Sequence, residues 1–320
     1  FLITGGAVGL AKRLKWPDDY FTLSHSISYQ HYNLKNYNTG LFTFGDGESN
    51  NLAYTIGISR NNTATNPIFP MSGSEFSVTA KVTLPYSAFS STDWESLDNE
   101  RSELEEVGPT DPDYVDATAR ISEIDQEKFK WLEYYKIKFK GTWYTQLVGK
   151  MVLRPSAEFG FLGAYNQDRG LPPFERFFLG GDGMVSYALD GRETIALRGY
   201  PNQSLSGNDG SVIYNKFSLE LRYPISLNPS ATFYGLIFAE AGNTFPTFEE
   251  FNPFNVKRSL GVGIRVFLPM FGMLGLDYGF GFDKLDYWST GYQGASDQSI
   301  QSKGYYPKLN FTIGMNLGEL

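Results

Sequence analysis

The residue whose chemistry most requires a partner is Arg198, which lies between Leu197 and Gly199 in the segment DGRETIALRGYPN, residues 190–202. A guanidinium presents fixed donors that match carboxylates, and two acids neutralise one arginine better than either acid alone. Two later segments, SLELRY and LIFAEAG, each supply one glutamate at an inward position, Glu220 and Glu240. These positions predict an ion-pair cluster in which both glutamates bind Arg198.

Covalent catalysis has little support in this sequence. The chain has no cysteine, and its two histidines are His25 and His31. His25 alternates with apolar residues, which favours a place in an interfacial belt over a role as a catalytic base. The sequence has no G-x-x-x-x-G-K-[ST] run, and DPDYVD lacks the spacing of a calcium loop. We therefore expect no enzyme activity, no metal, no cofactor and no nucleic-acid partner.

Stretches with period-two alternation recur along the chain and are the elements that must position these residues. In LGLDYGFGFD, every second residue from Leu274 to Phe282 is large and apolar, whereas Asp277 and four other small or acidic residues occupy the opposite face. KLNFTIGMNL repeats the pattern, and its apolar face consists of Leu309, Phe311, Ile313, Met315 and Leu317. Eleven such strands are expected, at residues 1–14, 19–34, 51–60, 74–84, 131–140, 147–157, 211–223, 231–242, 261–268, 274–283 and 308–317.

The connections between these strands alternate between short and long. Short connections such as WPDD, GTWYTQ and PMFG are each followed by a longer one, and residues 85–130 and 158–210 are the longest. Short turns on one rim and long loops on the other are typical of an outer-membrane barrel. The sequence therefore predicts an all-β fold, a transmembrane antiparallel β-barrel across residues 1–320, with further strands expected before residue 1 because such barrels have an even strand number.

Composition agrees with this class. Aromatic residues make up 16% of the chain, as interfacial girdles require, and no apolar run approaches the ~18 residues of a membrane-spanning helix. Residues 86–130 hold 13 acidic and 4 basic residues, a net charge of −9, so the rest of the chain is near +1 in a total of −8. We interpret this segment as a solvated acidic extracellular loop insertion.

The segment GLPPFERFFLGGDG followed by IALRGYPN resembles the loop that plugs the barrel in the BamA-type outer-membrane assembly and secretion family. That loop carries an aliphatic-Arg-Gly-aromatic tetrad, here Leu197, Arg198, Gly199 and Tyr200. The later strands match in order as well, from SLELRYPI through FAEAGNTF to LNFTIGMNL. The resemblance covers nearly the whole chain, as roughly the last eleven of about sixteen barrel strands.

The resemblance implies that residues 158–210 fold into the lumen and that Arg198 binds carboxylates of the inner wall, which map onto Glu220 and Glu240. It also implies a lateral seam at the final strand, where a client strand can add by β-augmentation. Family members usually close with an aromatic residue near this point, whereas this chain has Leu317.

The function implied is insertion and folding of other outer-membrane proteins, in the cell outer membrane of a Gram-negative bacterium. Expected partners are outer-membrane lipids, unfolded client proteins and accessory lipoproteins, for which residues 172–176 and 86–130 are candidate binding segments. A two-partner secretion or TamA-like transporter shares the tetrad, and a passive porin is the alternative from another class. Arg198 could brace the barrel, act in substrate passage, or do both.

Overall fold

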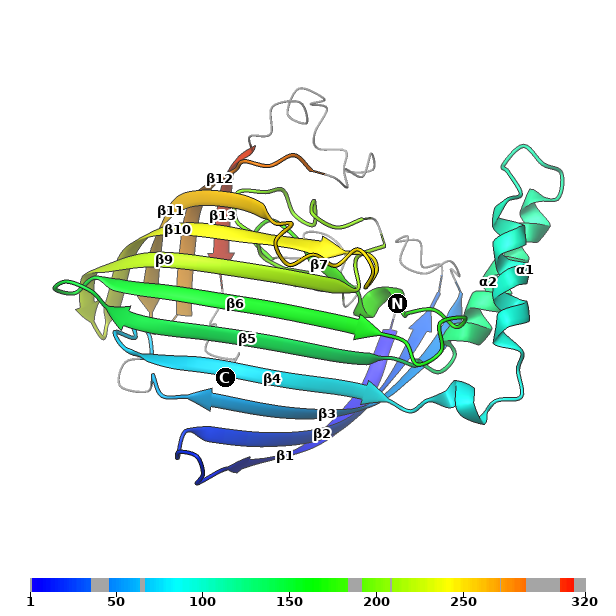
Figure 1. Ribbon diagram of the computed structural model, residues 1–320, viewed down its shortest axis with the longest axis horizontal. Coiled ribbons are helices and arrows are strands. Elements are labelled where there is room, and N and C mark those ends of the chain that lie inside the picture. The colour runs from blue at the N-terminus through cyan, green and yellow to red at the C-terminus, as the bar shows by residue number, and fades with distance from the viewer. Residues whose placement is uncertain are drawn as a thin grey trace.

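The computed structural model describes residues 2–35, 46–63, 67–183, 192–207, 209–270, 272–285 and 306–313. Eleven strands form one antiparallel sheet in the order β1-β2-β3-β4-β5-β6-β9-β10-β11-β12-β13. The strands are β1 Leu2–Arg13, β2 Phe21–Leu34, β3 Gly47–Asn61, β4 Gly73–Thr83, β5 Tyr135–Gln146, β6 Val152–Gly163, β9 Ile213–Asn228, β10 Ala231–Phe245, β11 Lys257–Leu268, β12 Gly272–Gly281 and β13 Tyr306–Ile313. The sheet curls around an interior, and within the described ranges its edges β1 and β13 do not pair with each other (Figure 1).

The two faces of the curled sheet differ in the way that the alternation predicts. On β12, the outer residues Leu276 and Tyr278 are 47% and 44% exposed, whereas Asp277 between them is 1% exposed. On β13, Leu309 and Phe311 are exposed and the Asn310 side chain is buried. Successive side chains of a strand point to opposite faces, so the apolar set lies outside and the polar set lines the interior. This is the arrangement of a transmembrane barrel wall.

Several strands are longer than the sequence pattern indicated. The segment GTWYTQ, expected as a turn, is the second half of β5, and the turn lies at residues 147–151 instead. Leu147 N–H donates to the carbonyl of Met151 at 2.9 Å, and Gly149 adopts a φ of 59° there. Polar residues that face a barrel interior resemble turn residues in sequence, which is why the strand ends were misplaced.

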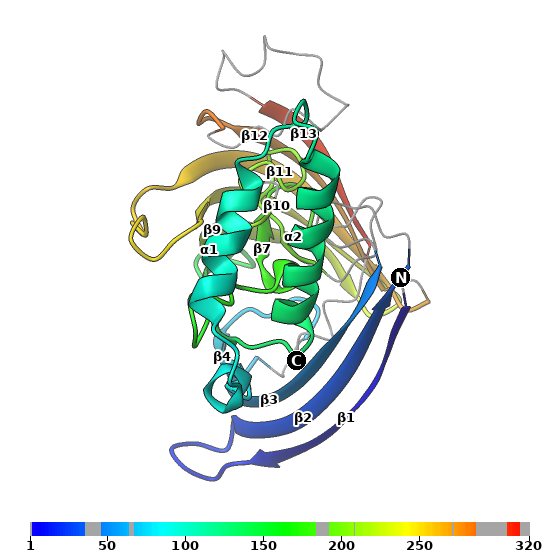
Figure 2. The same cartoon turned by 90° about the vertical axis from the view of Figure 1, so that its right-hand side faces the viewer.

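The acidic segment is a helical hairpin and not an irregular loop. A short 3-10 helix, η1 (Tyr86–Phe89), precedes α1 (Trp94–Glu105) and α2 (Tyr114–Phe129). Ion pairs of 2.7 Å join Arg101 to Asp125 and Arg120 to Glu100, so charged pairs connect the two helices. The hairpin stands at one end of the curled sheet (Figure 2). Neither of the described helices has the length and apolar character needed to cross a membrane.

The described parts of the connection between β6 and β9, residues 164–183, 192–207 and 209–212, lie largely inside the curl, and we call them the interior loop. It begins later than the predicted residue 158 because β6 continues to Gly163. The interior loop contains η2 (Pro173–Glu175), β7 (Phe177–Leu179) and β8 (Glu193–Ile195), and β7 pairs with β8 in parallel. Its apolar side chains form the larger buried cluster of the structure together with residues of the wall.

Candidate functional site

The predicted tetrad lies in the interior loop against the inner face of the wall. Leu197 and Tyr200 are 0% exposed and Arg198 is 7% exposed. A bridge between Gly181 and Leu197 connects the tetrad to the segment that follows β7. The tetrad is therefore a buried part of the interior and not an exposed loop tip.

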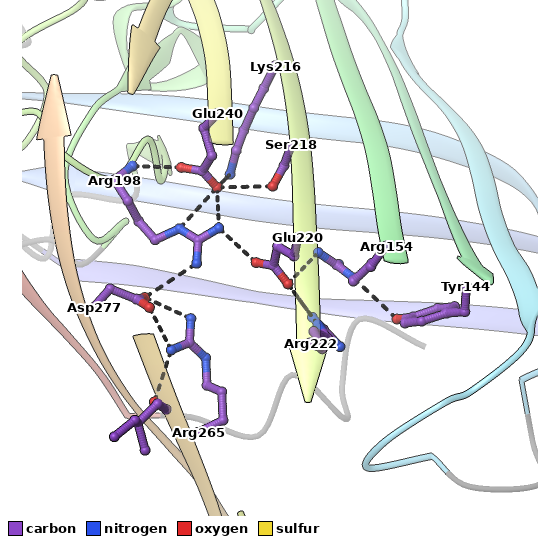
Figure 3. Close-up of polar contacts among 11 residues, drawn as sticks. Tyr144, Arg154, Arg198, Lys216, Ser218, Glu220, Arg222, Glu240, Arg265 and Asp277 are labelled. Atoms are coloured by element: carbon purple, nitrogen blue, oxygen red, sulfur yellow. Dashed lines mark hydrogen bonds and ion pairs between the residues drawn. The ribbon is translucent and has the colours of Figure 1, made fainter. Parts of the chain in front are cut away.

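Glu240 on β10 binds both the main chain and the side chain of Arg198 (Figure 3). Its Oε2 accepts the backbone N–H of Arg198 at 2.8 Å, and its Oε1 accepts Nε at 3.1 Å and Nη2 at 2.7 Å. Oε1 of Glu220 on β9 accepts Nη2 as well, at 2.7 Å. The structure thus brings together the arginine and the two glutamates that the sequence paired.

Neighbouring groups keep the Arg198 guanidinium charged. Burial alone would lower its pKa, but the carboxylates of Glu240 and Glu220 outweigh burial and raise the pKa above its ordinary value. The guanidinium carbon also lies 3.7 Å from the ring centroid of Phe238, within the range of a cation–π contact. Arg198 is a permanent buried cation with two kinds of partner.

A third carboxylate, Asp277 on β12, joins this cluster and was not predicted. Its Oδ2 lies 3.5 Å from Nη1 of Arg198, and its two oxygens accept Nη1 and Nη2 of Arg265 at 2.8 and 2.7 Å. Asp277 therefore connects the interior loop to the β11–β12 part of the wall. The alternation placed Asp277 and Arg265 on polar faces, but it could not show that they lie at the depth of Arg198.

Further cations surround the three carboxylates. Oε2 of Glu220 accepts Nε and Nη2 of Arg222 at 2.8 and 2.6 Å and lies 3.5 Å from Nη1 of Arg154. Lys216 Nζ lies 3.7 Å from Glu240. We call Arg198 with Glu220, Glu240 and Asp277 the Arg198 cluster. Each of its acids also contacts a wall cation, so removing Arg198 would not leave them entirely unpaired.

Glycines let the tetrad approach the wall. Gly199 has a φ of 89°, and a Cβ there would lie 2.9 Å from the backbone nitrogen and carbonyl carbon of Phe280. On the wall side, a Cβ on Gly281 would lie 2.6 Å from the Tyr200 ring. Glycine tolerates this left-handed conformation and leaves the space that the contact needs. The glycines of β12 are therefore the complement of the tetrad.

Tyr200 completes the contact at the end of β12. Its hydroxyl donates to the backbone carbonyl of Arg258 at 2.7 Å and accepts the backbone N–H of Asp283 at 3.1 Å. Arg258 and Asp283 also form an ion pair of 2.8 Å. The tetrad thus contacts β9 and β10 through Arg198 and the β11–β12 pair through Tyr200.

The predicted seam strand is partly described. β13 pairs with β12 from Leu274–Ile313 to Gly281–Tyr306, and Leu309 and Phe311 point outward from it. Its other edge has no partner strand within the described residues. Met315 and Leu317 lie outside the described residues.

A polar cavity of about 720 Å³ lies in the interior beside the Arg198 cluster. Acidic and basic side chains of the wall line it together, among them Glu158, Lys140 and Arg154.

His25 lies elsewhere, with Nδ1 2.6 Å from the Tyr54 hydroxyl. In the part of the chain that the structure describes, no three acidic, histidine or cysteine side chains are grouped as metal ligands.

Known proteins resemble this chain in sequence pattern and fold. A family model described as the Omp85 superfamily domain matches residues 4–316. The crystal structure of BamA from Haemophilus ducreyi lacking POTRA domains 1-3 has a TM-score of 0.59 and 16% identity, covering 98% of this chain and 54% of that one. The chain thus spans about half the length of that structure. LpxR from Salmonella typhimurium has a TM-score of 0.30 and 10% identity, covering 96% and 86% of the two chains. No curated protein sequence matches.

Proposed function

We propose, because the chain belongs to the Omp85 superfamily, that it is the membrane barrel of an outer-membrane protein that assembles or secretes other proteins. The wall with an apolar outer face and a polar interior supports placement in a membrane. The BamA barrel that shares the fold is the barrel of a larger protein, which supports a similar division here. The expected location is the cell outer membrane.

Our finer proposal is that this barrel inserts and folds other outer-membrane proteins. The observation that supports it over a passive pore is the binding of Arg198 by Glu220 and Glu240, which holds the interior loop against the inner wall. A pore for passive diffusion gains nothing from a buried, charge-paired plug, because the plug obstructs the path. A barrel that works at its wall can keep the lumen filled while client strands add at an edge.

The proposed place of insertion is the outer edge of β13. β13 pairs with β12 on one side, and a strand edge that opens at a seam is a template for another strand. Leu309 and Phe311 on the same strand face outward, toward the proposed lipid. An unsatisfied backbone N–H or C=O group in lipid costs about 2–7 kcal/mol. A client hairpin that pairs with β13 would satisfy the backbone groups along its paired edge.

The partners required by this function are outer-membrane lipids and unfolded barrel proteins, with accessory lipoproteins as further partners of an assembly complex. The structure places Phe174 and Glu175 in the interior, so residues 172–176 do not offer the exposed binding segment that we expected. Polypeptide secretion is the second candidate function, and the polar cavity of about 720 Å³ beside the interior loop favours it. Both functions use the same loop.

Two measurements on the full-length protein in lipid vesicles separate these functions. The first is the folding rate of an unfolded client barrel, read from its heat-modifiable gel mobility, with empty vesicles as control. The second is conductance across a planar bilayer. An insertase accelerates client folding and conducts little. Steady large conductance with no acceleration would identify a porin. A conductance that is blocked by added unfolded polypeptide, with no client folding, would identify a secretion barrel.

A further inference from the structure

A second charged cluster lies in the interior, where β4 and β5 meet the interior loop. Glu175 of η2 is 8% exposed, and its Oε1 accepts Lys81 Nζ at 2.7 Å and the Tyr134 hydroxyl at 2.6 Å. Lys136 Nζ donates to the Glu175 backbone carbonyl at 2.7 Å and lies 3.2 Å from its Oε2. Both carboxylate oxygens and the carbonyl of one loop residue are therefore bound by the wall.

A second acid of the interior loop reaches the same lysines. Glu193 of β8 lies 2.7 Å from Lys136 Nζ and 3.0 Å from Lys138 Nζ. The parallel pairing of β7 and β8 sets Glu193 opposite Phe177, two residues after Glu175. Lys136 Nζ also lies 4.6 Å from the Phe177 ring centroid. We call Glu175, Glu193, Lys81, Lys136 and Lys138 the Glu175 cluster.

The two clusters have opposite polarity. In the Glu175 cluster the loop supplies the acids and the wall supplies the lysines, whereas in the Arg198 cluster the loop supplies the base and the wall the acids. Exchanging the two loop segments would place acids against Glu220 and Glu240 and an arginine against Lys136. Like charges at a buried contact select strongly against the wrong arrangement.

We propose that Glu175 is a positioning residue, which fixes the first half of the interior loop to β4 and β5 so that Arg198 is presented to β9 and β10. The loop is then a strap held at two places on different parts of the wall. On β5, Lys136 and Lys138 alternate with the outward Ile137, so both lysines face the interior, where they bind the acids of the loop. The claim that Glu175 positions the interior loop does not depend on the proposed function. The claim that this position matters for client insertion rests on the proposed function.

The absence of cysteine in this chain allows a direct test of loop position. Ser206 is 3% exposed, and its hydroxyl accepts the backbone N–H of Leu179 on β7 at 2.8 Å and lies 3.5 Å from the Thr244 hydroxyl on β10, so reagent reaches it when the interior loop leaves the wall. The reporter is Ser206→Cys in the full-length protein in vesicles, and the measurement is its rate of labelling by a hydrophilic maleimide. Glu175→Gln should raise the rate at least about tenfold, because it removes the carboxylate that binds Lys81 and one of the two carboxylates that bind the buried Lys136.

A charge swap separates pairing from general damage to the fold. Glu175→Lys should raise the labelling rate at least as much as Glu175→Gln. Glu175→Lys combined with Lys81→Glu should bring the labelling rate part of the way back to that of the wild type, because Lys81 pairs with Glu175. Lys136→Gln tests the same contact from the wall. The matched control is Glu100→Gln, which breaks the exposed pair with Arg120 on the helical hairpin and should leave the rate unchanged.

An unchanged labelling rate in Glu175→Gln and Lys136→Gln would overturn the proposal, as would a swap that labels as fast as Glu175→Lys alone. Client folding rates measured on the same variants test whether the position of the interior loop matters for client insertion. Faster labelling in a protein that never accelerates client folding would keep the anchor and reject the proposed function.

Discussion

Glu240 binds Arg198 twice, through the backbone N–H at 2.8 Å and through the guanidinium at 2.7 and 3.1 Å. One carboxylate therefore fixes both the path of the interior loop and the direction of its arginine. The main-chain bond does not depend on the residue type at position 198, but the guanidinium contacts do. This difference makes substitutions at Arg198 informative about which contact holds the loop.

Arg198→Lys should weaken the attachment of the interior loop to the wall less than Arg198→Ala does. Lysine keeps a charge and the main-chain bond, but its point charge cannot bind Glu220 and Glu240 with the arginine fork. Removing one partner of a buried ion pair costs about 3–5 kcal/mol, and the wall cations Arg222 and Lys216 reduce that cost here. Limited proteolysis of the interior loop measures the effect. Equal protection in both variants and wild type would show that the Arg198 side chain does not hold the loop.

Gly199→Ala should destabilise the tetrad contact. The residue has a φ of 89°, and a Cβ would lie 2.9 Å from backbone atoms of Phe280, so strain and overlap add. Gly170→Ala is the matched control, since Gly170 lies in the same loop with a φ of 73° and open space around it. Denaturant unfolding should show that the free energy of unfolding falls by about 1 kcal/mol in the control, because of backbone strain, and by more in Gly199→Ala. Equal losses would mean that the close approach to β12 is not needed.

To predict this site from the sequence, one must know which face of the sheet each side chain lies on and how deep in the barrel it lies. Alternation along a strand gives the face, which was enough to place Glu220, Glu240 and Asp277 on the inner side. Depth in the barrel depends on the register between strands, such as Gly263 opposite Asp277, and one sequence does not determine it. The pairing of Arg198 with Asp277 and that of Glu175 with Lys136 both required that register.

The helical form of the acidic segment could not be predicted for a related reason. Its charges indicated a solvated loop, but Arg101 and Arg120 pair with acids of the other helix, which requires the hairpin to be formed first. Its apolar residues are few; Trp94 of α1 and Ile124 of α2 are buried, and the centroid of the Trp94 ring lies 4.6 Å from the guanidinium carbon of Arg169 in the interior loop. Such a hairpin has a weak periodic signal in sequence and depends on tertiary contacts.

Acid should release the first half of the interior loop. Burial by itself raises the pKa of Glu175, but Lys136 and Lys81 outweigh it and lower the pKa from 4.5 to about 2. A carboxyl whose pKa is lower in the folded state stabilises above its ordinary value and loses this contribution as pH falls toward the folded value. Pepsin cleavage of the loop should therefore rise between pH 4.5 and 2, with Tyr134 and Glu193 as the other titratable neighbours. An equally steep rise in Glu175→Gln would assign the change to other groups.

The β13 edge should capture client strands. Leu309→Cys, on the outward face of the edge strand, should form a disulfide with a single cysteine in the last strand of a client during insertion. Leu276→Cys on β12 is the matched control, because that residue is outward and 47% exposed but its strand is paired on both sides. Equal cross-linking from the two positions, measured by non-reducing gels, would reject a specific role for β13.

The most direct test of the central claim is the folding rate of a client barrel in vesicles that contain wild-type protein, Arg198→Ala or the control Arg120→Ala, whose residue lies on the exposed helical hairpin. The account predicts that wild type and Arg120→Ala accelerate client folding equally. It also predicts that Arg198→Ala lowers the acceleration by about tenfold or more, as expected if an interaction of at least about 1.4 kcal/mol supports the active arrangement. Full acceleration by Arg198→Ala, at equal amounts of folded protein, would contradict it.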